Sequence, residues 1–386
     1  HAARRTMIFL QSYGVSPGLS VKIHKKYSIE AESLIRANPY RLIDDIDGVG
    51  FRTADRIAQS LGISANSEYR LQAGLVYALQ EAASASGHTY LPREQLIFQA
   101  AHLLGLPEEA VEHHLQALVL SKRLQAEEID GVAVISLPDF HRAEWEIAHR
   151  LMNLSQFAQQ VMDGHVPSQI AAFERDNHIT FSPTQRAAIQ SATESGVLVI
   201  TGGPGTGKTT LINCILHVAG GDDVLLAAPT GRAAKRMSEA TGREAKTLHR
   251  LLEFGGDMEQ FQRNVDNPLD CSMIVVDEMS MVDIFLMRSL LRAIQPGTRI
   301  ILVGDADQLP PVGPGNVLRD ILSSGMVPHV RLTEIFRQEE QSMIVINAHR
   351  INGGENPVVN RRDGDFFYAS AASPQAAAQE IVGLCR

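Results

Sequence analysis

A glycine-rich turn at residues 202–209, between an apolar run and a helix-forming run, constrains this chain most. It reads Gly-Gly-Pro-Gly-Thr-Gly-Lys-Thr; residues 197–201 before it are apolar and largely β-branched, and residues 211–218 after it favour a helix. Glycines allow a tight turn whose backbone N–H groups point inward at phosphate oxygens. Lys208 adds positive charge at the β- and γ-phosphates, and the Thr209 hydroxyl can ligate Mg²⁺. The following helix directs its positive end at the same anion, so the sequence predicts a nucleoside triphosphate site.

Length and composition set broad limits. The chain has 386 residues, 44% of them hydrophobic and 20% charged, which predicts a soluble globular protein of two to four domains. No apolar run approaches the roughly 18 residues of a membrane span, and no signal-peptide pattern opens the chain. The cysteines Cys214, Cys271 and Cys385 lack metal-site spacing and suit a reducing cytosol, so we expect a cytoplasmic protein.

The charge distribution leaves nucleic-acid binding open. The net charge of −9 does not suggest a surface coated with basic side chains, yet residues 1–60 carry nine Lys or Arg against six Asp or Glu. The chain begins at His1 and ends part-way through an apparent helix that starts at Pro374. Both ends resemble cuts, so we expect a fragment.

Four stretches differ in pattern. Residues 1–65 read as short helices broken by Gly and Pro, residues 66–155 as mostly helical, and residues 156–180 as a polar linker. Within the second stretch, Asp130-Gly131 separates two strand-like runs, 124–129 and 132–137, and so predicts a hairpin. Helices followed by a hairpin are typical of a winged helix, although a plain helical spacer with a hairpin fits equally.

From Phe181 onward strands alternate with helices. The buried-type strand runs are residues 197–201, 224–228, 273–277 and 299–304. This alternation predicts an α/β domain with a parallel sheet and helices on both faces. Ligands bind such sheets at the carboxyl ends of the strands, where the following motifs fall.

Four polar side chains lie at the end of the third of these strand runs or after the fourth: Asp277, Glu278, Gln308 and Arg337. Asp277 can hold Mg²⁺, and the adjacent Glu278 can orient or deprotonate an attacking water. Gln308 lies after the next strand, where its amide can contact both a γ-phosphate and that water. Arg337 can neutralise charge on the transferred phosphoryl group. The structural alternatives are an exposed acidic strand end, an ordinary Asp/Pro turn, and an ion pair of Arg337 with Glu334.

The residues at the start of the first helix of this domain can be interpreted in two ways. Ser182 is a good N-cap, Pro183 suits the first helical position, and Gln185 completes a capping box. Alternatively, the Gln185 amide contacts the edge of an adenine. The two roles are compatible with each other.

Together these motifs resemble the first motor lobe of a superfamily 1 helicase of the RecD-like branch, over about residues 181–370. The Ala-Pro-Thr-Gly-Arg-Ala-Ala run and the Thr-x-His segment are especially similar to that branch. The segments that carry the resemblance are Thr201–Thr210, Ala228–Ala234, Thr247–Leu252, Val276–Ser280, Gly304–Pro311 and Phe336–Arg337.

The resemblance implies a RecA-like P-loop lobe at residues 181–352 that uses ATP and Mg²⁺. Preceding it would be a helix-hairpin-helix DNA-binding region at 1–65 and a winged-helix-like region at 66–155. It assigns catalytic or coupling roles to Glu278, Lys208, Gln308 and Arg337, and Mg²⁺ to Thr209 and Asp277. The implied ATP contacts are Gln185, Gly202, Gly203, Pro204, Gly205, Thr206, Gly207, Lys208, Thr209 and Thr210.

For DNA, the resemblance implies a single-strand path lined by Pro229, Thr230, Arg232, Thr247 and His249. Thr hydroxyls, an Arg and a helix N-terminus suit phosphate contact without base reading. The structural alternatives are a helix N-cap for Thr230 and a packed ring for His249. Family members move 5′ to 3′ on single-stranded DNA, so that polarity is implied as well.

One departure from the family is large. Such a motor needs a second RecA-like lobe with another arginine, and residues 353–386 read only as its start. We therefore expect the isolated chain to bind ATP·Mg²⁺ weakly and hydrolyse it poorly.

The N-terminal residues 43–58 fit a helix-hairpin-helix. The Gly48-Val49-Gly50 turn leaves N–H groups exposed for a phosphate, and Arg52 and Arg56 can follow the backbone without reading sequence. Ile46, Val49, Ala54 and Ile57 are expected to pack the two helices. A weaker copy is predicted at residues 13–26. The alternative is that these hairpins only pack or bind protein.

The polar segment 254–270 falls where the family often has a small strand-separating hairpin. Gly255-Gly256-Asp257 is the predicted turn, and an ordinary surface loop is the alternative.

The sequence as a whole indicates an ATP-dependent DNA helicase or translocase, acting on single strands and their junctions with duplex in repair or recombination. Alternatives are an RNA-directed superfamily 1 helicase and a non-catalytic DNA-binding scaffold with ATP as a structural ligand. The helix-hairpin-helix favours DNA over RNA, and Glu278, Gln308 and Arg337 argue against a scaffold. Protein partners cannot be inferred.

Overall fold

The computed structural model describes residues 2–156, 165–220, 223–256, 260–334, 342–359 and 365–385. Two compact units are present. The first comprises His1–Glu146 with Asp283–Phe285 and Pro311–Gly315, and the second contains the rest of the chain. Within the described ranges, no helix combines the length and apolar character that crossing a membrane requires.

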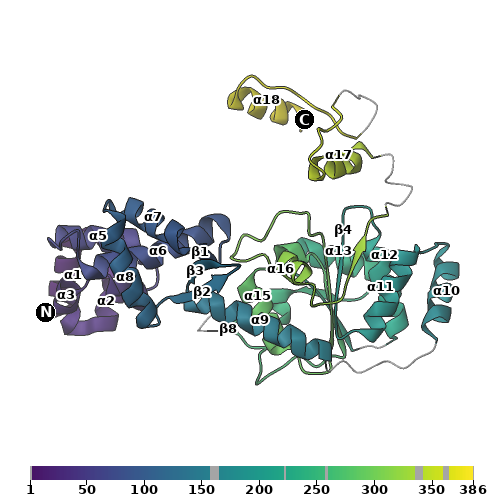
Figure 1. Cartoon of the computed structure of the whole chain (residues 1–386), viewed down its shortest axis with the longest axis horizontal. Coiled ribbons are helices and arrows are strands. Elements are labelled where there is room, and N and C mark those ends of the chain that lie inside the picture. Colours follow the sequence, from purple (N-terminus) through teal and green to yellow (C-terminus); the bar gives the residue numbers. More distant parts are fainter. Residues whose placement is uncertain are drawn as a thin grey trace. The chain divides into compact units, whose positions relative to one another are not determined.

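Short helices build most of the first unit (Figure 1), as expected for a chain region punctuated by Gly and Pro. Ser16 caps α2 by accepting from the N–H of Leu19, and Gly87 ends α6 with a left-handed φ of +71°. The helices are α1 (Ala2–Ser12), α2 (Pro17–Tyr27), α3 (Ala31–Ala37), α4 (Arg41–Asp45), α5 (Phe51–Ser60), α6 (Glu68–Ser86), α7 (Arg93–Leu104) and α8 (Glu108–Leu120).

The helix-hairpin-helix forms where the sequence predicts it, from α4 through the turn to α5. Gly48 has a φ of +92°, which favours glycine, and the N–H of Val49 donates to the carbonyl of Ile46 at 3.1 Å. The four expected packing side chains are all buried: Ile46, Val49, Ala54 and Ile57. They belong to one apolar core that also includes α6, α7 and α8, so residues from both predicted N-terminal regions share a core.

A buried ion pair joins the hairpin to the helices that follow it. Arg70 of α6 donates to Asp55 of α5 from Nε at 2.8 Å and from Nη2 at 3.3 Å, and its Nη1 donates to the carbonyls of Ala65 and Leu104. The Tyr40 hydroxyl donates to the same Asp55 carboxylate at 2.6 Å. Because several donors satisfy the buried groups, this network fixes how α5 meets α6 and α7.

The predicted Asp130-Gly131 hairpin is confirmed. Strands β2 (Gln125–Ile129) and β3 (Val132–Ser136) pair antiparallel, and both turn residues have positive φ, as a type I′ turn requires. A short strand, β1 (Tyr90–Pro92), pairs with the other edge of β3 and completes a three-stranded sheet. Helix α9 (Pro138–Gln156) follows.

In the second unit, six parallel strands form the expected sheet in the order β11-β4-β10-β9-β5-β6. The four sequence-predicted strands are its four inner strands. Their residues are almost all buried, which explains their continuous apolar runs. The strands are β4 (Val197–Gly202), β5 (Val224–Ala228), β6 (Ala245–Thr247), β9 (Met273–Val276), β10 (Arg299–Gly304) and β11 (His329–Leu332).

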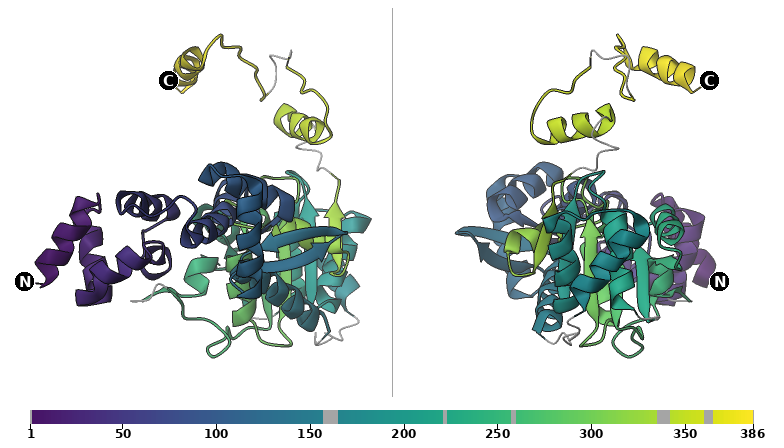
Figure 2. Two further views of the ribbon diagram at one scale, coloured as in Figure 1. Left: turned by 60° about the vertical axis from the view of Figure 1, so that its left-hand side comes forward. Right: turned by 90° about the vertical axis from the view of Figure 1, so that its right-hand side faces the viewer.

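Helices flank this sheet on both faces, with α11 and α12 on one side and α15 and α16 on the other (Figures 1 and 2). A core of buried apolar side chains lies between the sheet and α10, α11 and α12. The helices are α10 (Val166–Asn177), α11 (Pro183–Glu194), α12 (Lys208–Ala219), α13 (Gly231–Thr241), α14 (Leu248–Leu251), α15 (Ile284–Ala293), α16 (Val317–Ser324), α17 (Met343–Asn352) and α18 (Pro374–Leu384).

Candidate nucleotide site and single-strand path

The glycine-rich turn leads from the carboxyl end of β4 into α12. Gly205 and Gly207 have φ values of +76° and +77°, so the turn depends on glycine at both positions. The Thr206 hydroxyl donates to the carbonyl of Gly203 at 2.9 Å. A Cβ at Gly202 would lie 2.8 Å from the Thr206 hydroxyl oxygen and 2.9 Å from Leu332. The loop is therefore tight, and its conformation is fixed from within.

Lys208 and Thr209 open α12 directly after this loop. The Lys208 ammonium donates to the carbonyls of Gly202 and Gly203 at 2.6 and 2.9 Å, so it lies over the start of the loop. Thr209 is exposed in the first helical turn. A flexible ammonium, a hydroxyl and a helix N-terminus thus meet at one point, which is the arrangement that binds a phosphate chain.

Asp277 and Glu278 follow β9, two strands away from β4 in the sheet. The Glu278 N–H donates to Asp277 Oδ1 at 2.8 Å, and Glu278 has a left-handed φ of +55°. Burial raises the pKa of Asp277, partly offset by Lys208 and Arg236. Burial and the Asp277 charge raise the pKa of Glu278. Both carboxylates are therefore in surroundings that favour a nearby cation.

This chemistry fits Mg²⁺. A hydroxyl oxygen on Thr209 and a partly buried carboxylate on Asp277 are hard oxygen donors of the kind that Mg²⁺ takes, together with water and phosphate oxygens. Across the described ranges, no cluster of three or more His, Cys, Asp or Glu side chains forms an all-protein metal site. A cation shared with nucleotide phosphates is consistent with so few protein ligands.

Gln308 follows β10, the strand between β4 and β9. Its exposed side chain donates to the buried Asp305 carboxylate at 3.4 Å, and the Ala306 N–H donates to the Thr201 hydroxyl of β4 at 3.2 Å. The Gln308 loop is thus tied to the strand that enters the phosphate loop. The predicted Arg337 lies outside the described residues.

Gln185 forms the predicted capping box with Ser182 at the start of α11. Its Oε1 accepts from the Ser182 N–H at 3.0 Å, and its Nε2 donates to the Thr206 carbonyl at 3.1 Å. The structural role therefore extends to holding the phosphate loop. The adenine contact stays a prediction.

Two further helix N-termini lie at the adjacent strands β5 and β6. Thr230 caps α13 by accepting from the Ala233 N–H, and Thr247 caps α14 by accepting from the Arg250 N–H, each at 3.2 Å. The β5–β6 register pairs Ala228 with Thr247, so both caps lie at the same sheet edge. A hydroxyl that accepts at a cap can still donate its own proton to a phosphate.

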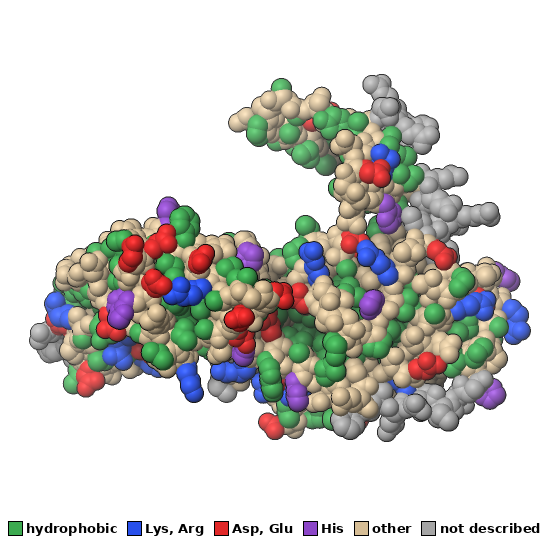
Figure 3. Space-filling model, in the orientation of Figure 1, with side chains coloured by type: hydrophobic (Ala, Val, Ile, Leu, Met, Phe, Trp, Pro, Cys, Tyr) green, Lys and Arg blue, Asp and Glu red, His purple; other side chains and the backbone are tan. Residues whose placement is uncertain are grey.

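Pro229 and Arg232 flank the first of these caps, and Arg232 is exposed. Two helix N-termini, two hydroxyl donors and a guanidinium therefore gather where a sugar–phosphate backbone is expected. Figure 3 shows Lys and Arg side chains dispersed among acidic ones on the face in view, so any DNA contact there depends on such local features.

His249 packs in an aromatic cluster with the predicted hairpin. Its ring centroid is 5.7 Å from that of Phe254 and 5.6 Å from that of Phe261. These two phenylalanines lie on β7 (Phe254–Gly255) and β8 (Gln260–Phe261), which pair antiparallel. At the base of this hairpin, Arg263 donates to the Glu253 carboxylate at 2.8 and 2.9 Å. The predicted hairpin exists; its turn residue Asp257 lies outside the described residues.

Two side chains near the nucleotide site, Arg236 and His349, were not predicted from the sequence. Arg236 of α13 lowers the pKa values of both Asp277 and Glu278. Its spacing of four residues from Arg232 on a helix was the available signal. His349 of α17 lies against Gly203; no local pattern in the sequence pointed to it.

In the helix-hairpin-helix, Gly50 is the N-cap of α5 and lies two residues after Gly48, which has a positive φ. Arg52 forms an exposed ion pair with Glu81 at 3.1 Å, whereas Arg56 is exposed in the following turn of the helix. The Val49 N–H, which was expected to be exposed, is already bonded to the Ile46 carbonyl, and the two arginines are not equally available. Phosphate binding by the helix-hairpin-helix stays a prediction.

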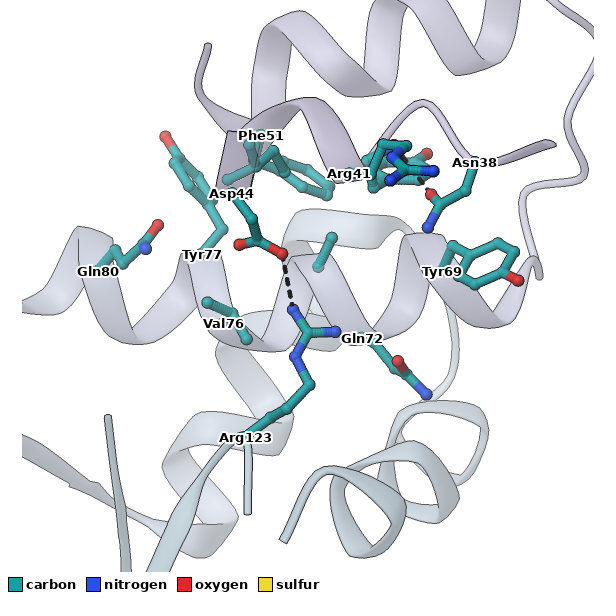
Figure 4. Close-up of a pocket in the computed structure, with 13 residues that line it drawn as sticks. Asn38, Arg41, Asp44, Phe51, Tyr69, Gln72, Val76, Tyr77, Gln80 and Arg123 are labelled. Atoms are coloured by element: carbon teal, nitrogen blue, oxygen red, sulfur yellow. Dashed lines mark hydrogen bonds and ion pairs between the residues drawn. The ribbon is translucent and has the colours of Figure 1, made fainter. Parts of the chain in front are cut away.

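A cavity of about 80 Å³ lies between this hairpin and α6 (Figure 4). Tyr69 and Phe51 line it, and the Arg123 guanidinium crosses it to the Asp44 carboxylate at 3.3 Å. Its other arginine, Arg41, pairs with Asp45. Because both cations are paired, we assign no phosphate-binding role to this cavity.

The strand–loop–helix, the paired carboxylates and the parallel sheet define a P-loop nucleotide-binding domain. Residues 185–314 match the family model described as an AAA domain, and residues 1–90 match the model of the ATP-dependent RecD2 DNA helicase HHH domain. The chain is therefore similar to RecD-like DNA helicases in both its N-terminal region and its nucleotide-binding domain.

Among its relatives is the ATP-dependent RecD2 DNA helicase of Deinococcus radiodurans, 33% identical over 365 residues, which are 92% of this chain and 50% of the relative. The RecBCD enzyme subunit RecD of Mycobacterium tuberculosis is 40% identical over 202 residues, 45% of this chain and 35% of that protein. The chain thus spans half of the length of the first relative and 35% of the length of the second. The solved Pif1 helicase from Candida albicans aligns over 53% of this chain and 55% of its own, with 23% identity and a TM-score of 0.37.

Proposed function

We propose that this chain binds ATP·Mg²⁺ and single-stranded DNA as part of an ATP-dependent DNA helicase or translocase that moves 5′ to 3′ and acts in repair or recombination. One observation carries the proposal. The phosphate loop, Asp277 and Glu278, and the capping threonines Thr230 and Thr247 all lie at the carboxyl ends of strands of one parallel sheet, where ligands of such sheets bind. The names of the relatives support the same activity and substrate.

In this mechanism Lys208 and the loop N–H groups hold the β- and γ-phosphates, while Thr209 and Asp277 hold Mg²⁺. Mg²⁺ held by these two residues would supply positive charge at the phosphate oxygens. Glu278 accepts a proton from the attacking water or orients it, because its carboxylate lies next to Asp277. Gln308 senses the terminal phosphate from the adjoining strand end, and Arg337 stabilises the developing charge.

On the DNA side, Thr230, Thr247 and Arg232 contact backbone phosphates, so binding is independent of base sequence. The β7–β8 hairpin would separate strands at a junction. Its aromatic contacts with His249 support this, because they connect the hairpin to the helix that contacts the DNA. Deletion of residues 254–270 in the full-length protein should leave ATP hydrolysis and abolish unwinding. Persistent unwinding would remove the hairpin from the mechanism.

The test of the function measures nucleotide binding and ATP hydrolysis by this chain with single-stranded DNA, with RNA and without nucleic acid. We expect Mg²⁺-dependent ATP binding that Lys208→Ala abolishes, and slow hydrolysis that DNA stimulates more than RNA. Glu278→Gln should bind ATP but not hydrolyse it. Stimulation by RNA alone would indicate an RNA helicase, and binding without any hydrolysis would indicate a scaffold.

A further inference from the structure

The imidazole ring of His349 lies directly against the phosphate loop. A Cβ built on Gly203 would be 3.0 Å from His349 Cε1, 3.5 Å from Nε2 and 3.9 Å from Nδ1. All three atoms belong to one ring, so the ring itself faces the loop at this glycine. The absence of a side chain at Gly203 makes room for it.

The segment that follows α17, the helix that carries His349, is hydrogen-bonded to its first turn and to its middle. The Asp365 carboxylate accepts from the N–H groups of Met343 and Ile344 at the start of α17. Further along, the fully buried Asn347 donates to the Val358 carbonyl at 3.0 Å and accepts from the Val358 N–H at 2.7 Å. His349 follows two residues later on the same helix.

The ring meets the loop at the end where the terminal phosphates bind. The Lys208 ammonium, the group that reaches β- and γ-phosphates in such loops, is 2.9 Å from the carbonyl oxygen of Gly203. His349 contacts this same glycine. Its side chain is exposed and carries at least one N–H donor in either protonation state.

We propose that His349 donates a hydrogen bond to the terminal phosphate of a bound nucleoside triphosphate, and so helps to distinguish triphosphate from diphosphate. This inference rests on the proposed nucleotide binding. It adds a contact from α17, which follows the sheet in the chain, to those made by the loop itself. A hydrogen bond to a charged phosphate oxygen is stronger than one to a neutral acceptor.

The test compares two probes, fluorescent ADP and a fluorescent non-hydrolysable ATP analogue, each titrated with Mg²⁺ into this chain. We expect His349→Ala to weaken binding of the ATP analogue about tenfold and binding of ADP less than about twofold. His349→Asn keeps an N–H donor and should recover part of the loss. Ile351→Ala is the matched control, because Ile351 is exposed on the same helix.

The results that would overturn this inference differ from the result that would overturn the proposed function. Equal weakening of both probes by His349→Ala would mean that the ring supports the loop rather than a phosphate, and an unchanged affinity would mean that it does neither; each overturns the inference. If the unsubstituted chain bound neither probe, the proposed function itself would fail. Thermal unfolding of each variant, with Lys208→Ala alongside, separates loss of binding from loss of folding.

Discussion

The side-chain amide of Gln185 donates a hydrogen bond to the carbonyl oxygen of Thr206, 3.1 Å away, inside the phosphate-binding loop. The other end of the same amide accepts from the Ser182 N–H, and the side chain is only 2% exposed. One buried amide therefore connects the start of α11 to the loop, and both of its polar ends have protein partners.

This connection gives the first prediction. Gln185→Ala leaves the Thr206 carbonyl and the Ser182 N–H without this partner, so we expect a loss of about 1–3 kcal/mol in the free energy of unfolding. The loosened loop should bind ATP and GTP more weakly to a similar extent. A much larger loss for ATP than for GTP would instead show that Gln185 contacts the adenine. Gln190→Ala, exposed on the same helix, is the control.

Asp277 gives a prediction about pH. Because burial raises its pKa, the unfolded chain releases this proton at a lower pH than the folded chain does. The folded state therefore loses relative stability as pH rises from the ordinary aspartate pKa, about 3.9, through the raised value. Asp277→Asn should be more stable than the unsubstituted chain at neutral pH, and the difference should shrink on acidification.

Denaturant unfolding across this pH range, without divalent cations, measures the difference. In the presence of ATP, Mg²⁺ should stabilise the unsubstituted chain and have a smaller effect on Asp277→Asn, because the variant lacks a charged ligand. A variant that is less stable than the unsubstituted chain at neutral pH would show that the Asp277 carboxylate is well compensated in the fold.

The inner strands of the sheet were predictable and its edges were not. Strands β4 and β10 are buried along their whole length and therefore read as unbroken apolar runs. The two missed strands, β6 (Ala-Lys-Thr) and β11 (His-Val-Arg-Leu), are the two outermost strands of the order, where solvent permits polar residues. Their short, mixed sequences carry no clear periodicity.

The residues of the candidate site likewise include some that the sequence predicts and one, His349, that it does not. Local motifs predicted the positions of Lys208, Asp277 and Gln308, because a strand end determines where the next residues lie. His349 meets Gly203 across nearly 150 residues of sequence, and this contact depends on the tertiary placement of α17. Such a contact leaves no periodic pattern in the local sequence, so the sequence did not predict it.

Close helix packing in the first unit depends on Gly74, which lies inside α6. A Cβ there would be 2.7 Å from Cδ2 of the buried Leu104 of α7. Glycine inside a helix normally costs about 1 kcal/mol relative to alanine, so an alanine would otherwise stabilise α6. We expect Gly74→Ala to destabilise the chain by about 1–2 kcal/mol instead, because overpacking outweighs that gain.

Urea unfolding checks this, and a double variant identifies the cause. In the background of Leu104→Ala, which removes the clashing atoms, Gly74→Ala should become neutral or stabilising. A penalty of equal size in both backgrounds would place its origin elsewhere.

The two arginines of the helix-hairpin-helix should differ in their contribution to DNA binding. Arg52 is already paired with Glu81, whereas Arg56 is exposed in the next turn of α5. If both contact phosphates, each substitution to alanine removes about one unit from the slope of log affinity against log salt concentration. We expect the Arg56→Ala loss of affinity to exceed that of Arg52→Ala, because freeing Arg52 requires breaking its ion pair.

Fluorescence anisotropy with labelled single-stranded DNA at several salt concentrations measures both slopes. Glu81→Gln serves as the matched variant: it releases Arg52 and should strengthen binding modestly, and the gain should disappear in the Arg52→Ala background. Unchanged slopes in both arginine variants would mean that the helix-hairpin-helix does not contact DNA. Its role would then be to pack α4 and α5 against α6.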